Sequence, residues 1–186
     1  MIQQADGKFV VVGGEVVPPP PCEPDELCAI YNATYRSVLM RYNSDGSLDS
    51  SFNGTGSVVT DVNSTAYSVI QQADGKLVMS GISGTQPALW RYNIDGSIDT
   101  DFGNDGKLTT TITNGAPFYN MPTSAYSVIQ QTDGKLVAAV GIHYCFTGLC
   151  ASATDYPFIC CGITTMARWI HRSVMMVSPA ACLKIV

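Results

Sequence analysis

The residues best suited to chemistry in this chain are the oxygen-bearing side chains of a seven-residue pattern, Asn-x-Asp-Gly-Ser-x-Asp, which occurs twice. The six residues that could bind a cation are Asn43, Asp45 and Asp49 in the first copy and Asn93, Asp95 and Asp99 in the second. Alternating oxygen donors before a glycine resemble the middle of a calcium loop, in which hard oxygen ligands surround one cation. Calcium is therefore the one cofactor that the pattern suggests.

A structural role also explains this pattern. Asp and Asn side chains accept hydrogen bonds from nearby backbone amides and so form turns of their own. Arg41 and Arg91 stand where a calcium loop has its first acidic ligand, and no glutamate closes either loop. We therefore expect turn formation and no cofactor, with weak calcium binding as the alternative. We expect each arginine to pair with an aspartate of its own or an adjacent repeat.

Both copies lie within a longer repeated unit. Its second half begins Arg-Tyr-Asn-x-Asp-Gly-Ser, at residues 41–47 and 91–97. Its first half contains Ile-Gln-Gln-x-Asp-Gly-Lys, at residues 2–8, 70–76 and 129–135. A repeat with a period of about 50 to 70 residues indicates a stacked or radial architecture, in which each unit covers the apolar face of its neighbour.

One unit has the composition of about four short antiparallel strands. Residues 66–72 and 77–79 are rich in strand-forming residues and flank an Asp-Gly pair, which is typical of a hairpin whose two turn residues both tolerate positive φ. Further strands are expected at residues 88–92 and 107–112, and helical periodicity is nowhere sustained. Four strands in a radial unit make a propeller blade. We therefore predict an all-β fold of tandem four-stranded antiparallel repeats, forming a fragment of a β-propeller.

The patterns Gln-x-Asp-Gly-Lys, Arg-Tyr-Asn-x-Asp-Gly-Ser-x-Asp and Phe-Gly-x-x-Gly-Lys resemble the bacterial delta-60 repeat family, over nearly all of residues 1–158. In the first unit Phe52-Asn53-Gly54 replaces the Phe-Gly of the family pattern. The resemblance implies β-propeller blades and an extracytoplasmic setting, in a secreted or surface-exposed protein. It implies no activity.

The repeats divide the chain into segments. We expect a first repeat at residues 1–65, with a truncated start and a long insert at 15–38, a second repeat at 66–124, and the first half of a third at 125–158. Because Met1 aligns with the middle of a strand, we expect the chain to be a fragment that lacks any upstream signal peptide. Because so few repeats cannot close a propeller ring, the chain should have open β-edges, and these should favour self-association.

Residues 159–186 depart from the repeat and contain no acidic residue. The shifted reading frame combines the third base of each codon with the first two bases of the next codon. Met and Trp each have a single codon, so each of them largely determines the amino acid that the shifted frame encodes at its position. That frame places glycine, aspartate, aspartate and glycine at Met166, Trp169, Met175 and Met176. These letters have the same spacing as Gly96, Asp99, Asp105 and Gly106. We therefore interpret residues 159–186 as a frameshifted, poorly ordered tail, and assign no role to its cysteines Cys160, Cys161 and Cys182.

Four cysteines remain outside that tail, as two close pairs in the long connections between second and third strands. We predict disulfides Cys22–Cys28 and Cys145–Cys150, which would place the protein in an oxidising compartment. Reduced loop cysteines are the alternative. Zinc is disfavoured, because only His143 lies near enough to add a nitrogen ligand.

Charge and chemistry narrow the function. The net charge is −5 and the ten Lys and Arg residues are scattered singly, so we expect neither nucleic-acid binding nor membrane association. No apolar run reaches about 18 residues, so no membrane insertion is expected. An active site needs groups that converge once, and we find only groups that repeat.

We therefore expect a non-enzymatic extracellular repeat scaffold or binding module, which contacts a protein or glycan through loops on one rim. A calcium-stabilised structural spacer is the alternative from another class. An enzyme is the least expected function.

Overall fold

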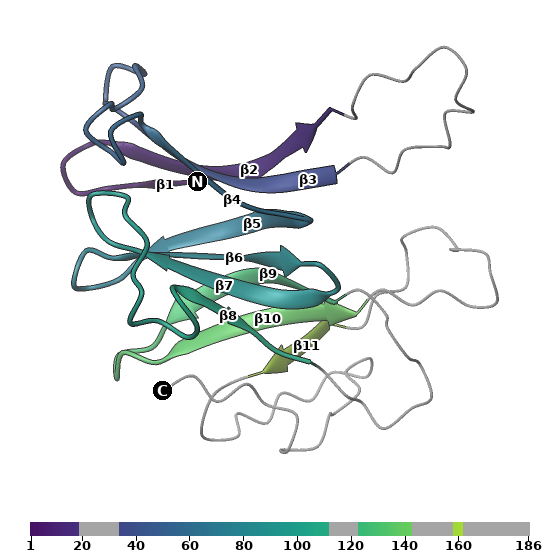
Figure 1. Ribbon diagram of the computed structural model, residues 1–186. Coiled ribbons are helices and arrows are strands. Elements are labelled where there is room, and N and C mark those ends of the chain that lie inside the picture. Colours follow the sequence, from purple (N-terminus) through teal and green to yellow (C-terminus); the bar gives the residue numbers. More distant parts are fainter. Residues whose placement is uncertain (19–33, 112–122, 143–157, 162–186) are drawn as a thin grey trace, which may run out of the picture.

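The computed structural model describes residues 1–18, 34–111, 123–142 and 158–161, which form eleven β-strands. They make two four-stranded sheets and one three-stranded sheet, in which all neighbouring strands are antiparallel (Figure 1). The all-β prediction of tandem antiparallel repeats is confirmed. Three sheets are fewer than a closed propeller needs, so the ring is open.

Each sheet is a meander whose strands follow one another along the chain. The first sheet contains β1 (Ile2–Gln3), β2 (Phe9–Val17), β3 (Thr34–Tyr42) and β4 (Ser57–Val62). The second contains β5 (Ser64–Gln71), β6 (Leu77–Ser83), β7 (Gln86–Tyr92) and β8 (Lys107–Thr109). The third contains β9 (Thr123–Gln130), β10 (Leu136–Ile142) and β11 (Phe158–Cys161).

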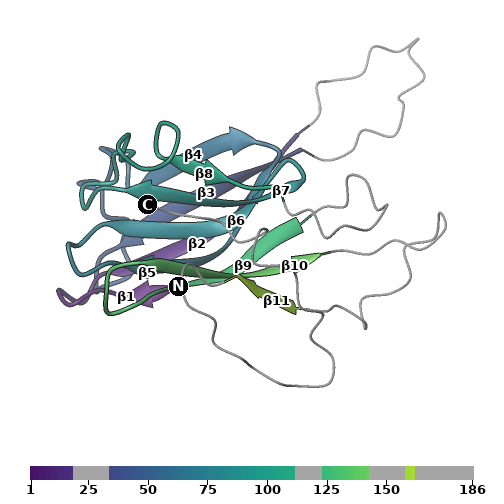
Figure 2. The same ribbon diagram turned by 90° about the horizontal axis from the view of Figure 1, so that it is seen from below.

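The three sheets lie face to face, with the second between the other two (Figures 1 and 2). Strand β5 contacts β2 and β3 of the first sheet, and β9 contacts β6 and β7 of the second. The first strands of successive sheets also adjoin, since β5 contacts β9. Each sheet therefore supplies one face of the core of its neighbour, as the repeat predicts.

The middle sheet is apolar on both faces. In β6, Leu77 and Met79 face the first sheet, whereas Val78 faces the third. In β7, Trp90 faces the first sheet and Leu89 the third. Side chains alternate between the faces of a strand, so a strand covered on both sides must be apolar throughout. Burying one such side chain stabilises the fold by roughly 1.5 to 3 kcal/mol.

The Asp-Gly hairpins between first and second strands share one turn in all three sheets. The amides of Gly7, Gly75 and Gly134 donate to the carbonyl oxygens of Gln4, Gln72 and Gln131, at 3.0, 2.9 and 3.0 Å. The three glycines have φ of +85°, +86° and +85°, but no aspartate of these turns has positive φ. The predicted hairpins are thus present, but only the glycine of each Asp-Gly pair uses positive φ. The turn spans four residues, with glycine alone in the left-handed region, so Asp keeps an ordinary conformation.

The strands on either side of the two long connections extend beyond the segment bounds expected from the sequence. Pairing between β2 and β3 continues to Val17 and Thr34, so both strands extend into the range 15–38 that we expected to be an insert. Strand β11 pairs with β10 in the place that β3 and β7 have in their sheets, and it includes the first three residues of range 159–186. The reading-frame interpretation stays a prediction.

Among the described residues, no helix is both long and apolar enough to span a bilayer.

The turn after β7 reaches across to the first sheet. The backbone amide of Asn53 donates to the carbonyl oxygen of Asp95 at 2.7 Å. Gly96 lies so close to Phe52 that an added Cβ would be 2.9 Å from the ring and 3.0 Å from the Asn53 nitrogen. Phe52 is fully buried and cannot move aside. Glycine is thus required at position 96 by contact with the neighbouring sheet as well as by its φ of +91°.

We predict that Gly96→Ala destabilises the protein more than Gly46→Ala, its counterpart in the first sheet. Both glycines have positive φ, so both variants lose roughly 1 kcal/mol through backbone strain. Only Gly96→Ala adds a clash, worth a further 1 to 3 kcal/mol or so, because nothing lies within 4 Å of a Cβ at Gly46. Denaturant unfolding measures both values, and equal losses would contradict this account of the contact.

Candidate functional site

The first five residues of each predicted cation-binding pattern fold as a self-contained turn. The Asn43 side-chain amide donates to Ser47 Oγ at 3.0 Å, and the Ser47 hydroxyl and backbone amide donate to Asp45 Oδ1 at 2.6 and 2.9 Å. The hydrogen bond from the hydroxyl, and then that from the amide, hold the pKa of Asp45 below its usual value. The turn is thus closed by its own side chains.

The second copy repeats this geometry. Asn93 donates to Ser97 at 3.0 Å, and Ser97 donates to Asp95 Oδ1 through its hydroxyl at 2.7 Å and its amide at 2.9 Å. The pKa of Asp95 is likewise lowered, mainly by the Ser97 hydroxyl. Turn formation, which we expected from the sequence, is what both copies do.

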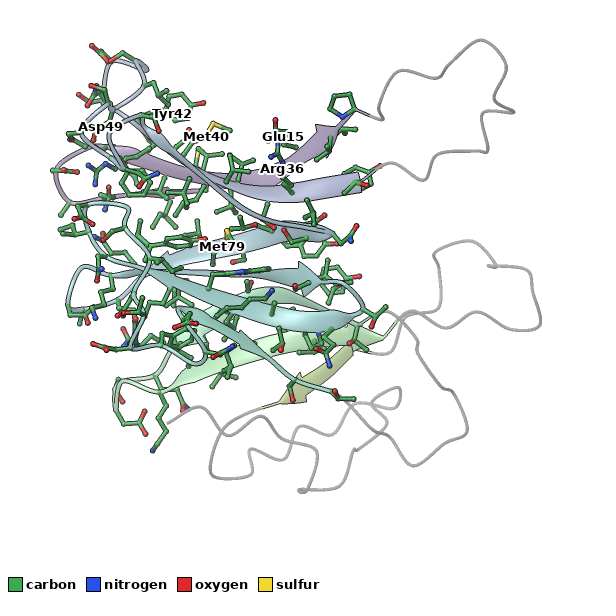
Figure 3. The ribbon with its side chains drawn as sticks, viewed as in Figure 1. Glu15, Arg36, Met40, Tyr42, Asp49 and Met79 are labelled. Carbon is green, nitrogen blue, oxygen red and sulfur yellow. The ribbon has the colours of Figure 1, made fainter. Side chains whose placement is uncertain are left out.

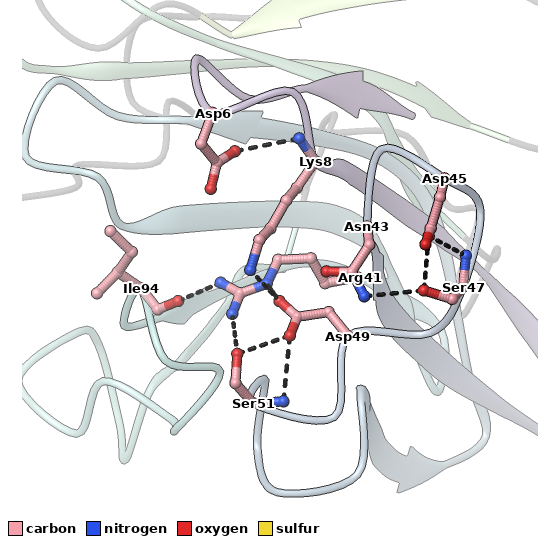
Figure 4. Close-up of polar contacts among 9 residues, drawn as sticks. All are labelled: Asp6, Lys8, Arg41, Asn43, Asp45, Ser47, Asp49, Ser51 and Ile94. Atoms are coloured by element: carbon pink, nitrogen blue, oxygen red, sulfur yellow. Dashed lines mark hydrogen bonds and ion pairs between the residues drawn. The ribbon is translucent and has the colours of Figure 1, made fainter.

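The last aspartate of the pattern lies apart from this turn, in a buried ion-pair cluster (Figure 4). Asp49 Oδ2 is 2.7 Å from Lys8 Nζ and 2.6 Å from Arg41 Nε. Asp49 Oδ1 accepts from the Ser51 hydroxyl at 2.6 Å and from its amide at 3.1 Å. Hydrogen bonds from Lys8, then Ser51, then Arg41 hold the pKa of Asp49 well below its usual range, although burial opposes this shift.

The second sheet has the same cluster. Asp99 Oδ2 is 2.8 Å from Lys76 Nζ and 2.6 Å from Arg91 Nε, and the pKa of Asp99 is lowered by Lys76 first and Arg91 second. In both sheets the guanidinium lies 4.6 Å from the centre of a phenylalanine ring, Phe52 or Phe102. We call each set of lysine, arginine and aspartate a latch. Each latch joins a hairpin turn, a third strand and the loop after that strand.

The predicted cation ligands therefore do not converge. Asp45 and Asp95 face their own turns, whereas Asp49 and Asp99 face two cationic side chains each. Nowhere in the described ranges do three or more His, Cys, Asp or Glu side chains come together in a way that could hold a metal ion. In this geometry Asp45 and Asp95 accept hydrogen bonds within their turns, and Asp49 and Asp99 form ion pairs.

Sequence reasoning anticipated the arginine–aspartate pairs but missed their lysine partners. Lys8 and Lys76 come from the Gln-x-Asp-Gly-Lys pattern, which we interpreted only as a turn signal. The available signal was the lysine that follows Asp-Gly in all three copies of that pattern. The third copy, Lys135, instead pairs with Asp133 of its own turn at 2.6 Å.

Sequence reasoning also missed a tyrosine pair on β5 and β9. The ring centres of Tyr67 and Tyr126 are 5.1 Å apart and the rings are inclined by 37°. The pairing of β5 with β6 skips Tyr67, and that of β9 with β10 skips Tyr126, so each tyrosine is the extra residue of a β-bulge. Bulges re-aim side chains. Tyr67 remains 43% exposed and offers aromatic surface to solvent.

The predicted disulfide cysteines Cys22, Cys28, Cys145 and Cys150 all lie outside the described residues. Both disulfides stay predictions.

We predict that Asp49→Asn lowers the free energy of unfolding by about 2 to 4 kcal/mol at neutral pH, because Lys8 and Arg41 would lose their buried counter-ion. The lower end allows for the partial hydration of Lys8, whose side chain is 29% exposed. Because the pKa of Asp49 is lowered by folding, its contribution is fully present above about pH 4 and is lost as the pH falls through the folded-state pKa.

Unfolding free energies measured from pH 7 to pH 2 test this prediction. Below about pH 4 the unaltered chain should lose stability more steeply than Asp49→Asn, by up to about 1.4 kcal/mol per pH unit. Asp101→Asn, on the exposed loop of the second sheet, controls for removing one negative charge. Identical slopes for the unaltered chain and Asp49→Asn would refute the role of Asp49 in the latch.

We predict that millimolar calcium leaves the melting temperature unchanged. The carboxylates of Asp45 and Asp49 accept hydrogen bonds from neighbouring groups and face apart, so a calcium ion would have to displace these partners. Thermal melts with calcium and with a chelator measure the effect. A rise in melting temperature with calcium that Asp45→Asn abolishes would instead support the calcium-stabilised spacer.

A family model described as a domain of unknown function (DUF5122), a β-propeller, matches residues 29–52 and 72–102. The matched stretches contain both Asn-x-Asp-Gly-Ser turns and both arginine–aspartate pairs of the latches. No curated protein and no solved structure matches the chain significantly. The match supports the β-propeller architecture, whereas the narrower delta-60 assignment stays a prediction. The chain is thus similar to β-propeller repeats of unknown function in two stretches that correspond to its first and second sheets.

Proposed function

We propose that this chain belongs to a non-enzymatic, extracytoplasmic repeat scaffold that binds a protein or glycan partner through the connections between its second and third strands. The observation that carries the proposal is the contrast between the two edges of the sheets. One edge repeats the same turns and the same lysine–aspartate and arginine–aspartate pairs in the first and second sheets, and the other carries connections of very different length.

The constant edge holds the hairpin turns and the latches. In the first and second sheets its lysine, arginine and aspartate side chains form the same ion pairs at nearly the same distances. Asp49 and Asp99 are buried and neutralised by cations, so they support the scaffold and are not presented to a substrate. Repeated groups of this kind favour a structural role over catalysis.

The variable edge is where β2, β6 and β10 end and the following strands begin (Figure 1). Strands β6 and β7 are joined through Gly84 and Thr85 alone, whereas residues 18–33 connect β2 to β3 and residues 143–157 connect β10 to β11. Loops of variable length at one edge of a rigid scaffold are typical of binding surfaces.

The first sheet offers apolar surface beside this edge. Val16 and Tyr35 are direct partners across β2 and β3, and they are 55% and 45% exposed. Val62, paired with Arg36, is 55% exposed. The Arg36–Glu15 ion pair of 3.3 Å lies beside them, away from Asp49 (Figure 3). An exposed tyrosine among apolar and charged neighbours suits contact with a partner.

A binding experiment tests the proposal. The chain would be screened against a glycan array and, as bait, against surface-protein extracts. We predict that a ligand found in this way is lost when residues 18–33 are replaced by a Gly-Ser linker of equal length, with the melting temperature unchanged.

The matched control is Ile94→Ala, which trims a 60%-exposed side chain at the constant edge. It should leave binding intact. Binding that survives loop replacement but is lost in Ile94→Ala would place the interaction at the other edge and overturn the proposal. A chain that binds nothing in either screen but melts at a higher temperature with calcium would favour the spacer function.

A further inference from the structure

The arginines of the first and second latches differ in the partners of their terminal Nη donors. Arg41 Nη1 donates to the carbonyl oxygen of Ile94 at 2.7 Å, across the boundary between the two sheets, and Nη2 donates to Ser51 at 3.3 Å. Arg91 makes the same bond to its own aspartate, but among the described residues nothing accepts a hydrogen bond from its Nη1 or Nη2. The Arg91 side chain is 21% exposed and that of Arg41 only 9%.

On the first sheet, the surface formed by Arg41, Phe52 and Asn53 makes three contacts, all with the turn that follows β7. The Ile94 carbonyl accepts from Arg41, and the Asp95 carbonyl accepts from the amide of Asn53. Gly96 covers the edge of the Phe52 ring, where no Cβ fits. The turn is thus recognised through two backbone carbonyls and one missing side chain.

The second sheet presents the same three features. Arg91, Phe102 and Gly103 stand where the first sheet has Arg41, Phe52 and Asn53. Within the described ranges the amide of exposed Gly103 has no acceptor, whereas the amide of Asn53 has one. The second sheet therefore carries a guanidinium and an amide whose donors find no acceptor in the described part of the chain, in a geometry that binds an Asn-x-Asp-Gly-Ser turn elsewhere in the same molecule.

We propose that the surface formed by Arg91, Phe102 and Gly103 is a docking site for one further Asn-x-Asp-Gly-Ser turn, supplied by the third repeat when residues 159–177 are read in the shifted frame. The turn follows the third strand in both complete sheets, and β11 already pairs with β10 as a third strand. In the shifted frame Met166 becomes the glycine that corresponds to Gly96, the residue that must lack a Cβ. The shifted frame thus necessarily encodes glycine at the one position where this surface excludes a Cβ.

The test compares two chains by amide hydrogen exchange, which reports hydrogen bonding at single residues. One is the chain as it exists. The other is a restored chain in which residues 159–177 are replaced by Leu-Leu-Arg-Tyr-Asn-Asn-Asp-Gly-Ser-Leu-Asp-Thr-Ser-Phe-Gly-Asp-Asp-Gly-Lys, in which every residue is one that the shifted frame can encode. The Asn53 amide should be protected in both, because its acceptor Asp95 is present in both. The Gly103 amide should exchange freely in the existing chain and become at least tenfold more protected in the restored one.

Two variants of the restored chain sharpen the test. Alanine in place of the glycine that replaces Met166 should return Gly103 to free exchange while Asn53 stays protected. Arg91→Lys, which keeps a positive charge beside Asp99 but removes the Nη donors, should lower the folding constant more in the restored chain than in the existing one. Arg41→Lys, the matched control, should have the same effect in both chains, because its acceptor Ile94 is unchanged.

A Gly103 amide that stays unprotected in a restored chain with a protected Asn53 amide would overturn the proposal. If the Asn53 amide also loses protection in the restored chain, a peptide with the restored sequence of residues 159–177 is added to the existing chain instead. If a saturating concentration of this peptide does not protect the Gly103 amide, the proposal is overturned. Protection of Gly103 in the existing chain that grows with protein concentration would overturn the assigned occupant, since the Asn43–Ser47 turn of a second copy would then fill the site.

Discussion

A buried carboxylate is the constraint around which each complete blade is arranged. Asp49 and Asp99 are 5% and 4% exposed, and an ionised group at such a position is costly unless cations and hydrogen-bond donors surround it. Lys8 and Arg41 meet this requirement for Asp49, and they come from the hairpin turn and the third strand. Removing the loop that carries Asp49 would leave two cations without their counter-ion, and removing the hairpin turn or the third strand would take away one of the two ion-pair partners of Asp49, so the latch couples the stability of the three segments.

The other organising force is apolar, and it acts between blades. Neither four-stranded sheet has a core of its own, because each cluster of buried side chains is formed by two adjacent sheets. The latch contributes here as well, since the guanidinium of Arg41 lies over Phe52 and donates to a carbonyl of the next sheet. Polar and apolar contacts thus fix the same boundary, and stability is shared by neighbouring repeats.

Much of this fold follows from the sequence. Runs of strand-forming residues and Asp-Gly turns located the strands of the second sheet, and the repeated Asn-x-Asp-Gly-Ser pattern located its turn after the third strand. The arginine–aspartate pairing was predictable because unlike charges recur at fixed spacing. The lysine of each latch was not, because its partner lies 41 residues away in the first sheet and 23 away in the second, at distances that only the meander fixes. The bulges at Tyr67 and Tyr126 were also hidden, because a bulge is a property of strand register and leaves the local composition unchanged.

The turn that joins the first two blades is bound through its main-chain carbonyl oxygens. The side chain at the variable position of the Asn-x-Asp-Gly-Ser pattern is therefore not constrained by this contact. Position 94 is isoleucine and its equivalent in the first sheet is Ser44, yet the contact with Arg41 uses only the carbonyl oxygen. A gene built from such units can therefore accumulate substitutions at that position, and duplicate or exchange whole blades, without redesigning the joint between them. The joint is a generic connector, and the individuality of each blade is left to the edge where its loops differ.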